Sequence, residues 1–223
     1  DPLATNKSNV EGFLNMLIAS KEAKVKSFTY AASSSSYGDH PDLPKVEHKI
    51  GRPLSPYAVT KYINELYADV FARNYNFQTI GLRYFNIFGP RQDPRGAYAA
   101  VIPIWIQSMI DNNEIFINGD GKTSRDFTFV DNAIQANIFA ATANDHAKNE
   151  VYNIACGSRI SLIEMFTTLK LSINKKGNLY LKEPIFRDFR SGDVLHSEAD
   201  ISKAQSKLGY LPSHQFNEGI EET

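Results

Sequence analysis

Residues 26–38, KSFTYAASSSSYG, decide the fold of this chain. The first seven residues are mostly apolar or aromatic, which is typical of a strand that is covered on both faces. The serine-rich remainder is typical of the loop at the carboxyl end of such a strand. In an α/β protein that end of the strand is where ligands bind, so the serines are candidates for a site.

The residues that follow predict a helix and then a second strand. After a polar loop over residues 39–54, Ser55 and Pro56 form a good helix start, with serine as the cap and proline at the first helical position. This helix is expected to reach about Asn74, and residues 78–85 alternate as a strand does. Strand, helix and strand in this order predict an α/β fold with a parallel sheet and crossover helices.

Elements outside this core are shorter on the carboxyl side. A helix with one apolar face is expected before residue 26. Later elements are expected at 101–110, 114–117, 127–130, 131–142, 151–155, 161 onward and 200–209, with Asp131 and Asp200 capping their helices and residues 161–164 forming a capping box. We therefore divide the chain into a main α/β part, residues 1–90, and a smaller lobe, residues 91–223, from which segments return to the main sheet.

Composition excludes several classes of function. A net charge of -1 gives no basic field for nucleic acid or for an anionic membrane surface. The single cysteine excludes an internal disulfide and fits a cytoplasmic protein, and no run of about 20 apolar residues predicts a membrane span. No metal site is predicted, because the histidines fall at no metal-ligand spacing: His40, His48, His146, His196 and His214.

One pair of side chains carries the chemistry. Tyr57 and Lys61 lie four residues apart on the predicted helix and therefore share one face. A lysine ammonium in that position stabilises a phenolate, which then serves as a general base. Taken alone the pair also fits two exposed residues on an amphipathic helix. Ser33 and Asn86, at the ends of the two strands, converge on the same crevice and favour a site.

Four segments together resemble the UDP-hexose 4-epimerases of the extended short-chain dehydrogenase/reductase family, and most of all the bacterial UDP-N-acetylglucosamine 4-epimerases of surface-polysaccharide pathways. They are ASSSSYGD at 32–39, SPYAVTK at 55–61, LRYFN at 82–86 and GDGKTSRD at 119–126. The resemblance runs essentially along the whole chain. It implies a partial Rossmann-like sheet that binds NAD in residues 1–90 and a lobe that binds the nucleotide sugar in residues 91–223.

The resemblance also implies roles for single residues. Tyr57 is the base, and Lys61 holds the nicotinamide ribose and favours the phenolate. Ser33 assists proton transfer, and Ser34 lies beside the sugar. Residues expected at the cofactor are Asn9, Ala31, Ala32, Ser33, Tyr57, Lys61 and Tyr84. Residues expected at the UDP-sugar are Ser34, Asn86, Ala100, Val101, Phe116, Ile117, Asn118, Arg125, Arg190, Asp193 and Ser197.

The implied reaction is NAD-dependent epimerisation at carbon 4 through a 4-keto sugar. A tyrosine at the place of Ser197 marks epimerases restricted to plain hexoses, so serine there favours UDP-GlcNAc and UDP-GalNAc. The resemblance further implies a homodimer formed through long helices, with the helix that carries Tyr57 as a candidate.

The chain contains no glycine-rich dinucleotide turn. We therefore expect the front strands and that turn to be missing from it, and the chain alone to be inactive and to carry little NAD.

Two alternatives stay open at this point. The first is a nucleotide-sugar 4,6-dehydratase or decarboxylase of the same fold. Relatives with that activity usually carry an acidic residue before the Tyr-Gly of the serine loop, where this chain has Ser34 and Ser35. The second is a binding module that kept the fold without catalysis.

Overall fold

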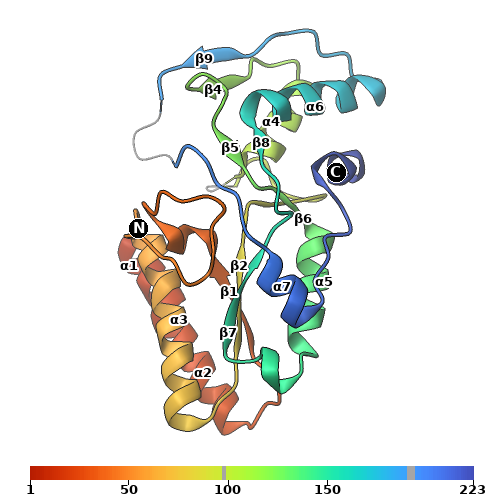
Figure 1. Cartoon of the computed structure of the whole chain (residues 1–223). Helices are drawn as coiled ribbons and strands as arrows, with labels where there is room; N and C mark the ends of the chain where they lie inside the picture. The colour runs from red at the N-terminus through yellow and green to blue at the C-terminus, as the bar shows by residue number, and fades with distance from the viewer. Residues whose placement is uncertain (97–98, 190–193) are drawn as a thin grey trace.

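The centre of the molecule is a parallel sheet. The computed structural model describes residues 1–96, 99–189 and 194–223, and within them this sheet has three strands in the order β1-β2-β7 (Figure 1). The strands are β1 (Thr29–Ser33), β2 (Ile80–Tyr84) and β7 (Glu150–Ile154). All neighbours run parallel, with β2 paired to both of the others. The predicted parallel α/β sheet is thereby confirmed, and β7 joins it from the later half of the chain.

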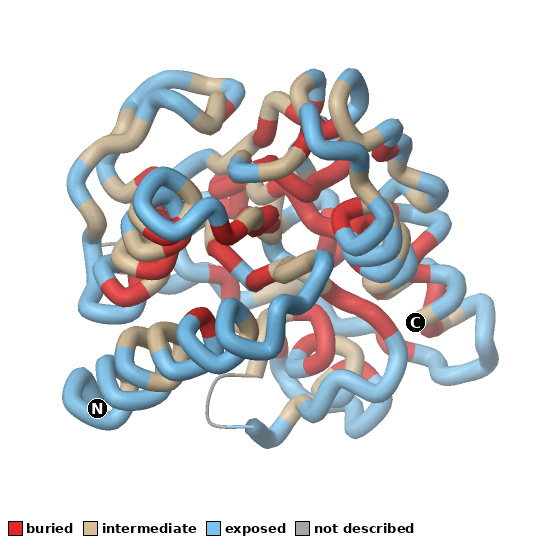
Figure 2. Tube along the Cα trace, turned by 90° about the horizontal axis from the view of Figure 1, so that it is seen from below, coloured by how far each residue is buried: buried red, intermediate tan, exposed pale blue. Residues whose placement is uncertain are grey.

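Helices cover both faces of this sheet (Figure 1). On one face lie α1 (Pro2–Asn6), a π-helical stretch (Lys7–Glu11), α2 (Gly12–Glu22) and α3 (Pro56–Tyr75), and on the other lie α5 (Val130–Ala141) and α7 (Ser202–Leu208). Buried residues gather between these layers, whereas the outer sides of the helices are exposed (Figure 2). The layering follows from the sequence, because a strand of apolar residues needs cover on both faces.

Helix α3 begins and ends where its sequence predicts. The Ser55 hydroxyl accepts a hydrogen bond from the Ala58 amide at 3.1 Å, and Pro56 occupies the first turn. The helix stops at Asn76, whose backbone is left-handed with φ of 49°. Asparagine tolerates that conformation better than most residues, which explains the sharp end one residue beyond the predicted limit.

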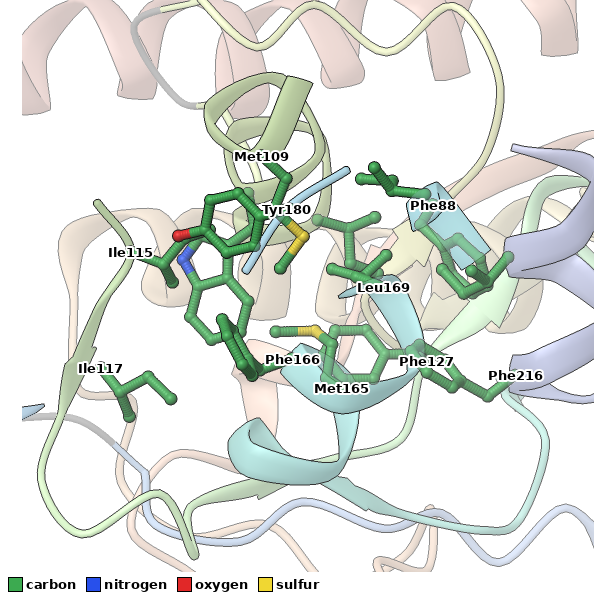
Figure 3. Close-up of a cluster of buried hydrophobic side chains, with 14 of the residues drawn as sticks. Phe88, Met109, Ile115, Ile117, Phe127, Met165, Phe166, Leu169, Tyr180 and Phe216 are labelled. Atoms are coloured by element: carbon green, nitrogen blue, oxygen red, sulfur yellow. The ribbon is translucent and has the colours of Figure 1, made fainter. Parts of the chain in front are cut away.

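The rest of the chain builds a second apolar core (Figure 3). Three helices pack around it: α4 (Val101–Ile110), α6 (Leu162–Lys175) and α8 (Phe216–Glu222). Phe88 contacts both Phe127 and Phe216, with ring centroids 6.4 and 5.6 Å apart. Such edge and tilted ring contacts add to the stabilisation by burial. Short strand pairs cross this lobe: β3 (Ile87–Phe88) with β6 (Thr128–Phe129), β4 (Phe116–Asn118) with β9 (Ile185–Arg187), and β5 (Ser124–Arg125) with β8 (Ile160–Ser161).

Three expectations about this part are corrected. Asp131 is not the cap of its helix, because α5 already begins at Val130 and Asp131 lies in its first turn. Asp200 is not the cap of α7 either: it lies just before the cap residue Ile201 and accepts from the Ser202 amide at 2.8 Å. The helix that ends at Gly209 is not the last one, since α8 follows. Helix α8 has only seven residues, which is too short for its apolar residues to show a helical repeat in the sequence.

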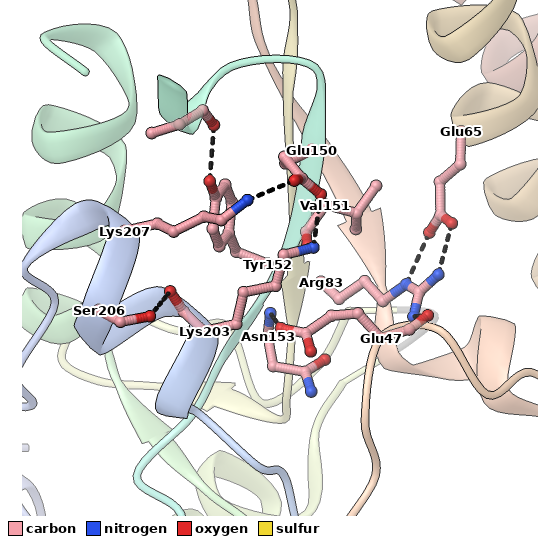
Figure 4. Close-up of polar contacts among 11 residues, drawn as sticks. Glu47, Glu65, Arg83, Glu150, Val151, Tyr152, Asn153, Lys203, Ser206 and Lys207 are labelled. Carbon is pink, nitrogen blue, oxygen red and sulfur yellow. Dashed lines mark hydrogen bonds and ion pairs between the residues drawn. The ribbon is translucent and has the colours of Figure 1, made fainter. Parts of the chain in front are cut away.

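A buried polar network joins the layers of the main sheet (Figure 4). The Arg83 guanidinium on β2 makes two hydrogen bonds to the Glu65 carboxylate on α3, at 2.8 and 2.6 Å. It also donates to the backbone carbonyl of Glu47 at 3.0 Å and lies 4.8 Å from the ring centroid of Tyr37. These contacts fasten the loop 39–54 to the sheet. Across the described residues, no helix is both long and apolar enough to cross a bilayer.

Candidate functional site

The site begins at the carboxyl end of β1. Ser33 ends this strand and caps the following 3₁₀ turn, Ser34–Tyr37. Its Oγ accepts from the Ser35 amide at 3.2 Å and from the Ser35 hydroxyl at 2.9 Å. The turn thus holds the Ser33 hydroxyl in one place, and its hydrogen remains available to a ligand.

Tyr57 and Lys61 lie side by side near the start of α3. The Lys61 Nζ is 5.9 Å from the centroid of the Tyr57 ring and donates to the Ala31 carbonyl of β1 at 3.0 Å. This bond ties the helix to the strand that carries Ser33. Burial lowers the pKa of Lys61 from its ordinary value of 10.5. Tyr57 is 46% exposed, so a ligand can reach its hydroxyl.

The predicted cofactor residues fall into two groups. Asn9 and Tyr57 line one open hollow of about 790 Å³, and the Asn9 amide donates to the Thr60 hydroxyl at 3.1 Å. Ala31 lies against Lys61 through its carbonyl, and the neighbouring Ala32 is buried. Tyr84 is the register partner of Ser33 in the sheet, and its hydroxyl accepts from Asn137 of α5 at 2.7 Å, while burial raises its pKa.

A second cavity, of about 310 Å³, opens beside the serine turn. Four of the residues predicted to bind the sugar nucleotide line it: Ser34, Asn86, Arg125 and Ser197. They come from four separate stretches of the chain, which the fold brings together. The volume is at the lower end of the range for small-molecule sites, about 300 to 1,000 Å³.

Buried Asp126 positions the residues on the far wall of this cavity. Its carboxylate accepts from the amides of Cys156, Gly157 and Ala199 at 2.9, 3.0 and 3.2 Å. Burial raises the pKa of Asp126 to about 7, while the three amide donors act in the opposite direction. The Asp126 backbone carbonyl also accepts from the Asn86 side chain at 2.9 Å. One carboxylate therefore fixes the stretch around residues 197–199 relative to the strands.

Arg125 and Ser197 are linked through the backbone of β5. Arg125 Nη1 donates to the carbonyls of Ser124 and Leu195 at 2.9 and 3.2 Å. The Ser197 amide donates to the Ser124 carbonyl at 3.0 Å. A guanidinium and a small hydroxyl residue thus line the same cavity wall.

The predicted uridine residues lie elsewhere in the lobe. Ala100 caps α4 and Val101 begins it, while Phe116, Ile117 and Asn118 form β4. The Arg187 guanidinium lies 3.3 Å from the centroid of the Phe116 ring. None of these residues is among those that line the 310 Å³ cavity. Arg190 and Asp193, also predicted at the nucleotide, lie outside the described residues.

Lys45 is a cavity residue that sequence reasoning missed. Only 5% of it is exposed, and its Nζ donates to the His40 carbonyl. Burial lowers its pKa, with nearby Asp42 opposing the shift. The sequence around Lys45 is a polar loop and does not indicate burial. Lys45 is buried by contacts with residues 198–200, which are distant in the sequence. Ser35, Tyr37, Leu54, Ser55 and Ala58 line the cavity as well.

Fold and site together define a class. A serine at the end of a parallel strand, with a tyrosine and a lysine one turn apart on the next helix, is the arrangement of the extended short-chain dehydrogenases/reductases. The chain belongs to the NAD dependent epimerase/dehydratase family, whose model matches residues 1–155.

Solved structures of similar proteins agree with this. The UDP-glucose 4-epimerase of Thermotoga maritima, solved with UDP-glucose, is 36% identical with a TM-score of 0.92, over 100% of this chain and 70% of that one. The UDP-N-acetylglucosamine 4-epimerase of Methanobrevibacter ruminantium, in complex with UDP-N-acetylmuramic acid, is 36% identical with a TM-score of 0.91, over 100% and 69%. The UDP-glucuronic acid 4-epimerase of Bacillus cereus, in complex with UDP-glucuronic acid and NAD, is 30% identical with a TM-score of 0.84, over 97% and 66%.

Proposed function

We propose that the protein catalyses NAD-dependent epimerisation at carbon 4 of a UDP-hexose. The observation that carries this proposal is the position of Tyr57, Lys61 and Ser33 beside a cavity lined by Ser34, Asn86, Arg125 and Ser197. The first set supplies a base on α3 next to the end of β1, and the second supplies hydroxyl, amide and guanidinium groups that suit a sugar diphosphate. The similar proteins with UDP-sugar 4-epimerase names support the same activity.

The residues present fit an NAD cofactor. Asn9 and Tyr57 line the larger hollow. Lys61 joins the start of α3 to β1 through its hydrogen bond to the Ala31 carbonyl. When bound, NAD would supply reversible hydride transfer at carbon 4 of the sugar. Lys61 and Tyr57 are the residues that would hold its nicotinamide ribose, and Asn9 would contact it from the first helices.

The chain's own part in the reaction is the movement of a proton. Tyr57 takes the proton from the hydroxyl on carbon 4 and later gives it back to the carbonyl oxygen. The Lys61 ammonium favours the phenolate by its positive charge. Ser33 is held by the turn that follows it, so its hydroxyl is positioned to bridge the sugar hydroxyl and Tyr57.

Replacement of the base tests the proposal directly. In the protein as expressed from its own gene, assayed with added NAD and UDP-GlcNAc, Tyr57→Phe is expected to lower kcat by two orders of magnitude or more. Tyr57 is half exposed, so the fold should survive, as circular dichroism can confirm. Tyr62→Phe on the same helix is the matched control and should keep its rate. A Tyr57→Phe protein with near-normal turnover would refute the assignment.

The preferred substrates are proposed to be UDP-GlcNAc and UDP-GalNAc. Ser197 lines the cavity, and a tyrosine there would occupy volume that an acetamido group on carbon 2 needs. Densely packed pockets do not yield to an added ring. Ser197→Tyr should therefore lower kcat/KM strongly for the acetylated pair and only slightly for UDP-glucose and UDP-galactose.

Exposed Ser206 provides the control for this second test, since Ser206→Tyr adds the same ring away from the cavity. Equal losses on both substrate pairs, or no loss on either, would remove Ser197 from the specificity argument.

Cavity chemistry disfavours dehydration. No acidic side chain is among the described residues that line the 310 Å³ cavity, whereas elimination of water needs an acid near the sugar. Product analysis separates the activities: an epimerase interconverts two sugars without a lasting 4-keto product. Tight UDP-sugar binding without turnover, in protein that carries NAD, would instead point to a binding module.

A further inference from the structure

Three potential metal ligands meet at the end of the molecule where α5 begins. Asp131 lies in the first turn of α5, His214 lies in the segment between α7 and α8, and Glu222 ends α8. One ligand atom from each lies within 4.8 Å of the other two. None of the three lines the cavity of the proposed active site. Because they are far apart in sequence, their spacing gives no signal of a metal site.

The histidine is held by a buried scaffold. Asn132 is fully buried, and its amide nitrogen donates to the His214 carbonyl at 2.7 Å. The Asn132 Oδ1 accepts from the backbone amides of Ser213 and His214 at 2.8 and 3.1 Å. The His214 ring also packs on Phe129, with centroids 4.9 Å apart. The imidazole is therefore fixed before any ligand arrives, as a preformed site requires.

Hydrogen bonds at the ring determine which nitrogen faces the carboxylates. The Ser213 hydroxyl donates to Asn132 Oδ1 at 3.1 Å and lies 2.9 Å from His214 Nδ1. When that single hydroxyl hydrogen points to Asn132 Oδ1, Nδ1–H is the donor to Ser213. The other nitrogen, Nε2, lies 3.0 Å from the Glu222 carboxylate. In this tautomer the neutral ring turns its Nε2 lone pair toward the carboxylate, an arrangement that a metal ion between the two groups would satisfy.

We propose that Asp131, His214 and Glu222 bind one divalent transition-metal ion, with Zn²⁺ the best fit. One imidazole and two carboxylates are ligand types that Zn²⁺ accepts in a tetrahedral site, with water in the fourth position. Two carboxylates also balance the charge of a divalent ion. The bond from Nδ1–H to Ser213 is the outer-shell contact that orients a ligating histidine. Asp131 and Glu222 are exposed, so an ion reaches the site from solvent. The bound ion would join the start of α5 to the end of α8.

Zinc titration of the untagged, EDTA-treated protein tests the site. Isothermal titration calorimetry with ZnCl₂ at pH 7.5 should show one ion per chain, and Zn²⁺ should raise the melting temperature. Asp131→Asn, His214→Gln and Glu222→Gln should each weaken Zn²⁺ binding at least about tenfold. Co²⁺ in place of Zn²⁺ should give visible absorption bands that His214→Gln abolishes.

Two neighbours serve as controls. Glu221→Gln changes the adjacent residue, whose carboxylate pairs with Lys175 at 3.2 Å, and should leave Zn²⁺ affinity unchanged. His146→Gln removes another histidine and should also have no effect. No Zn²⁺ binding by the parent protein, or an unchanged isotherm in His214→Gln, would overturn the proposal and leave His214 as a hydrogen-bonding partner of Glu222 only. Either result leaves the epimerase assignment untouched, because these residues lie outside that cavity.

Discussion

The buried ion pair between Arg83 and Glu65 makes a strong prediction about stability. Their side chains are only 2% and 6% exposed, and two short hydrogen bonds join them (Figure 4). Glu65→Leu removes the carboxylate and leaves the guanidinium buried without its counter-charge. The Glu47 carbonyl at 3.0 Å still accepts from Arg83, and Tyr37 still lies beside it, but neither is a carboxylate that could replace the counter-charge. The fold must then either keep an unpaired charge in its interior or open to let water in.

The expected loss is large. Breaking a buried pair by removing one partner costs about 3 to 5 kcal/mol of unfolding free energy. For a chain of this length that corresponds to a fall in Tm of roughly 6 to 20 °C. Arg83→Met should cost about as much, since it leaves Glu65 buried and unpaired. The double variant removes both charges and replaces them with apolar groups. It should stay within about 2 kcal/mol of the parent, the remaining cost being the lost bond to Glu47.

Urea unfolding followed by circular dichroism measures these losses, and the four proteins form a double-mutant cycle. The matched control is the exposed pair of Arg73 and Asp69, whose side chains are 64% and 60% exposed although their atoms are 2.7 Å apart. Asp69→Asn should cost less than about 1 kcal/mol. If Glu65→Leu costs no more than this control, or if the two single losses simply add in the double variant, burial of the charges does not dominate and the reasoning fails.

Two further predictions concern single residues of the smaller lobe. Burial raises the pKa of the Cys156 thiol to about 12. At pH 8, Cys156 in the native protein should therefore react with a disulfide reagent about three orders of magnitude more slowly than an ordinary thiol. Rapid labelling before urea is added would contradict this. Ser161→Ala removes a capping box and should cost about 1 kcal/mol at pH 7. Hydrogen bonds from Ser161 lower the pKa of Glu164, and the stability they contribute is lost as pH falls through that pKa. The loss of unfolding free energy in Ser161→Ala, measured by urea unfolding, should therefore be smaller at acid pH.

The sequence was informative wherever a local signal determines structure. Ser55 and Pro56 mark the start of α3 because capping depends on residues within one turn, and the structure places that start as predicted. The apolar runs of β1 and β2 predicted parallel strands for the same kind of reason. That Tyr57 and Lys61 lie on the same side of α3 follows from helix periodicity, since residues four apart share a face.

Contacts between distant segments were beyond sequence reasoning. Lys45 is buried because residues 198–200 pair with its backbone, yet both stretches look like polar loops. The Asn153 side chain donates to the Lys45 and Asp200 carbonyls at 2.8 and 3.0 Å. No periodicity records such a contact, because it depends on which loop ends are brought to one sheet edge. The wrong cap predictions are errors of one or two residues. The structure places the caps at Phe129 and Ile201 instead of Asp131 and Asp200.

Buried polar side chains hold the walls of the proposed active site. On one wall, Arg83 and Asn153 fasten the loop 39–54 that contributes Lys45 and Leu54. On the other, Asp126 fastens the stretch that contributes Ser197. An apolar contact tolerates sliding, whereas a buried hydrogen bond is lost with small displacements and costs about 1 to 3 kcal/mol when left unmade. A cavity that must present hydroxyl, amide and guanidinium groups to both faces of one sugar needs walls that do not slide. The placement of these polar ties around the cavity therefore follows from the chemistry proposed for it.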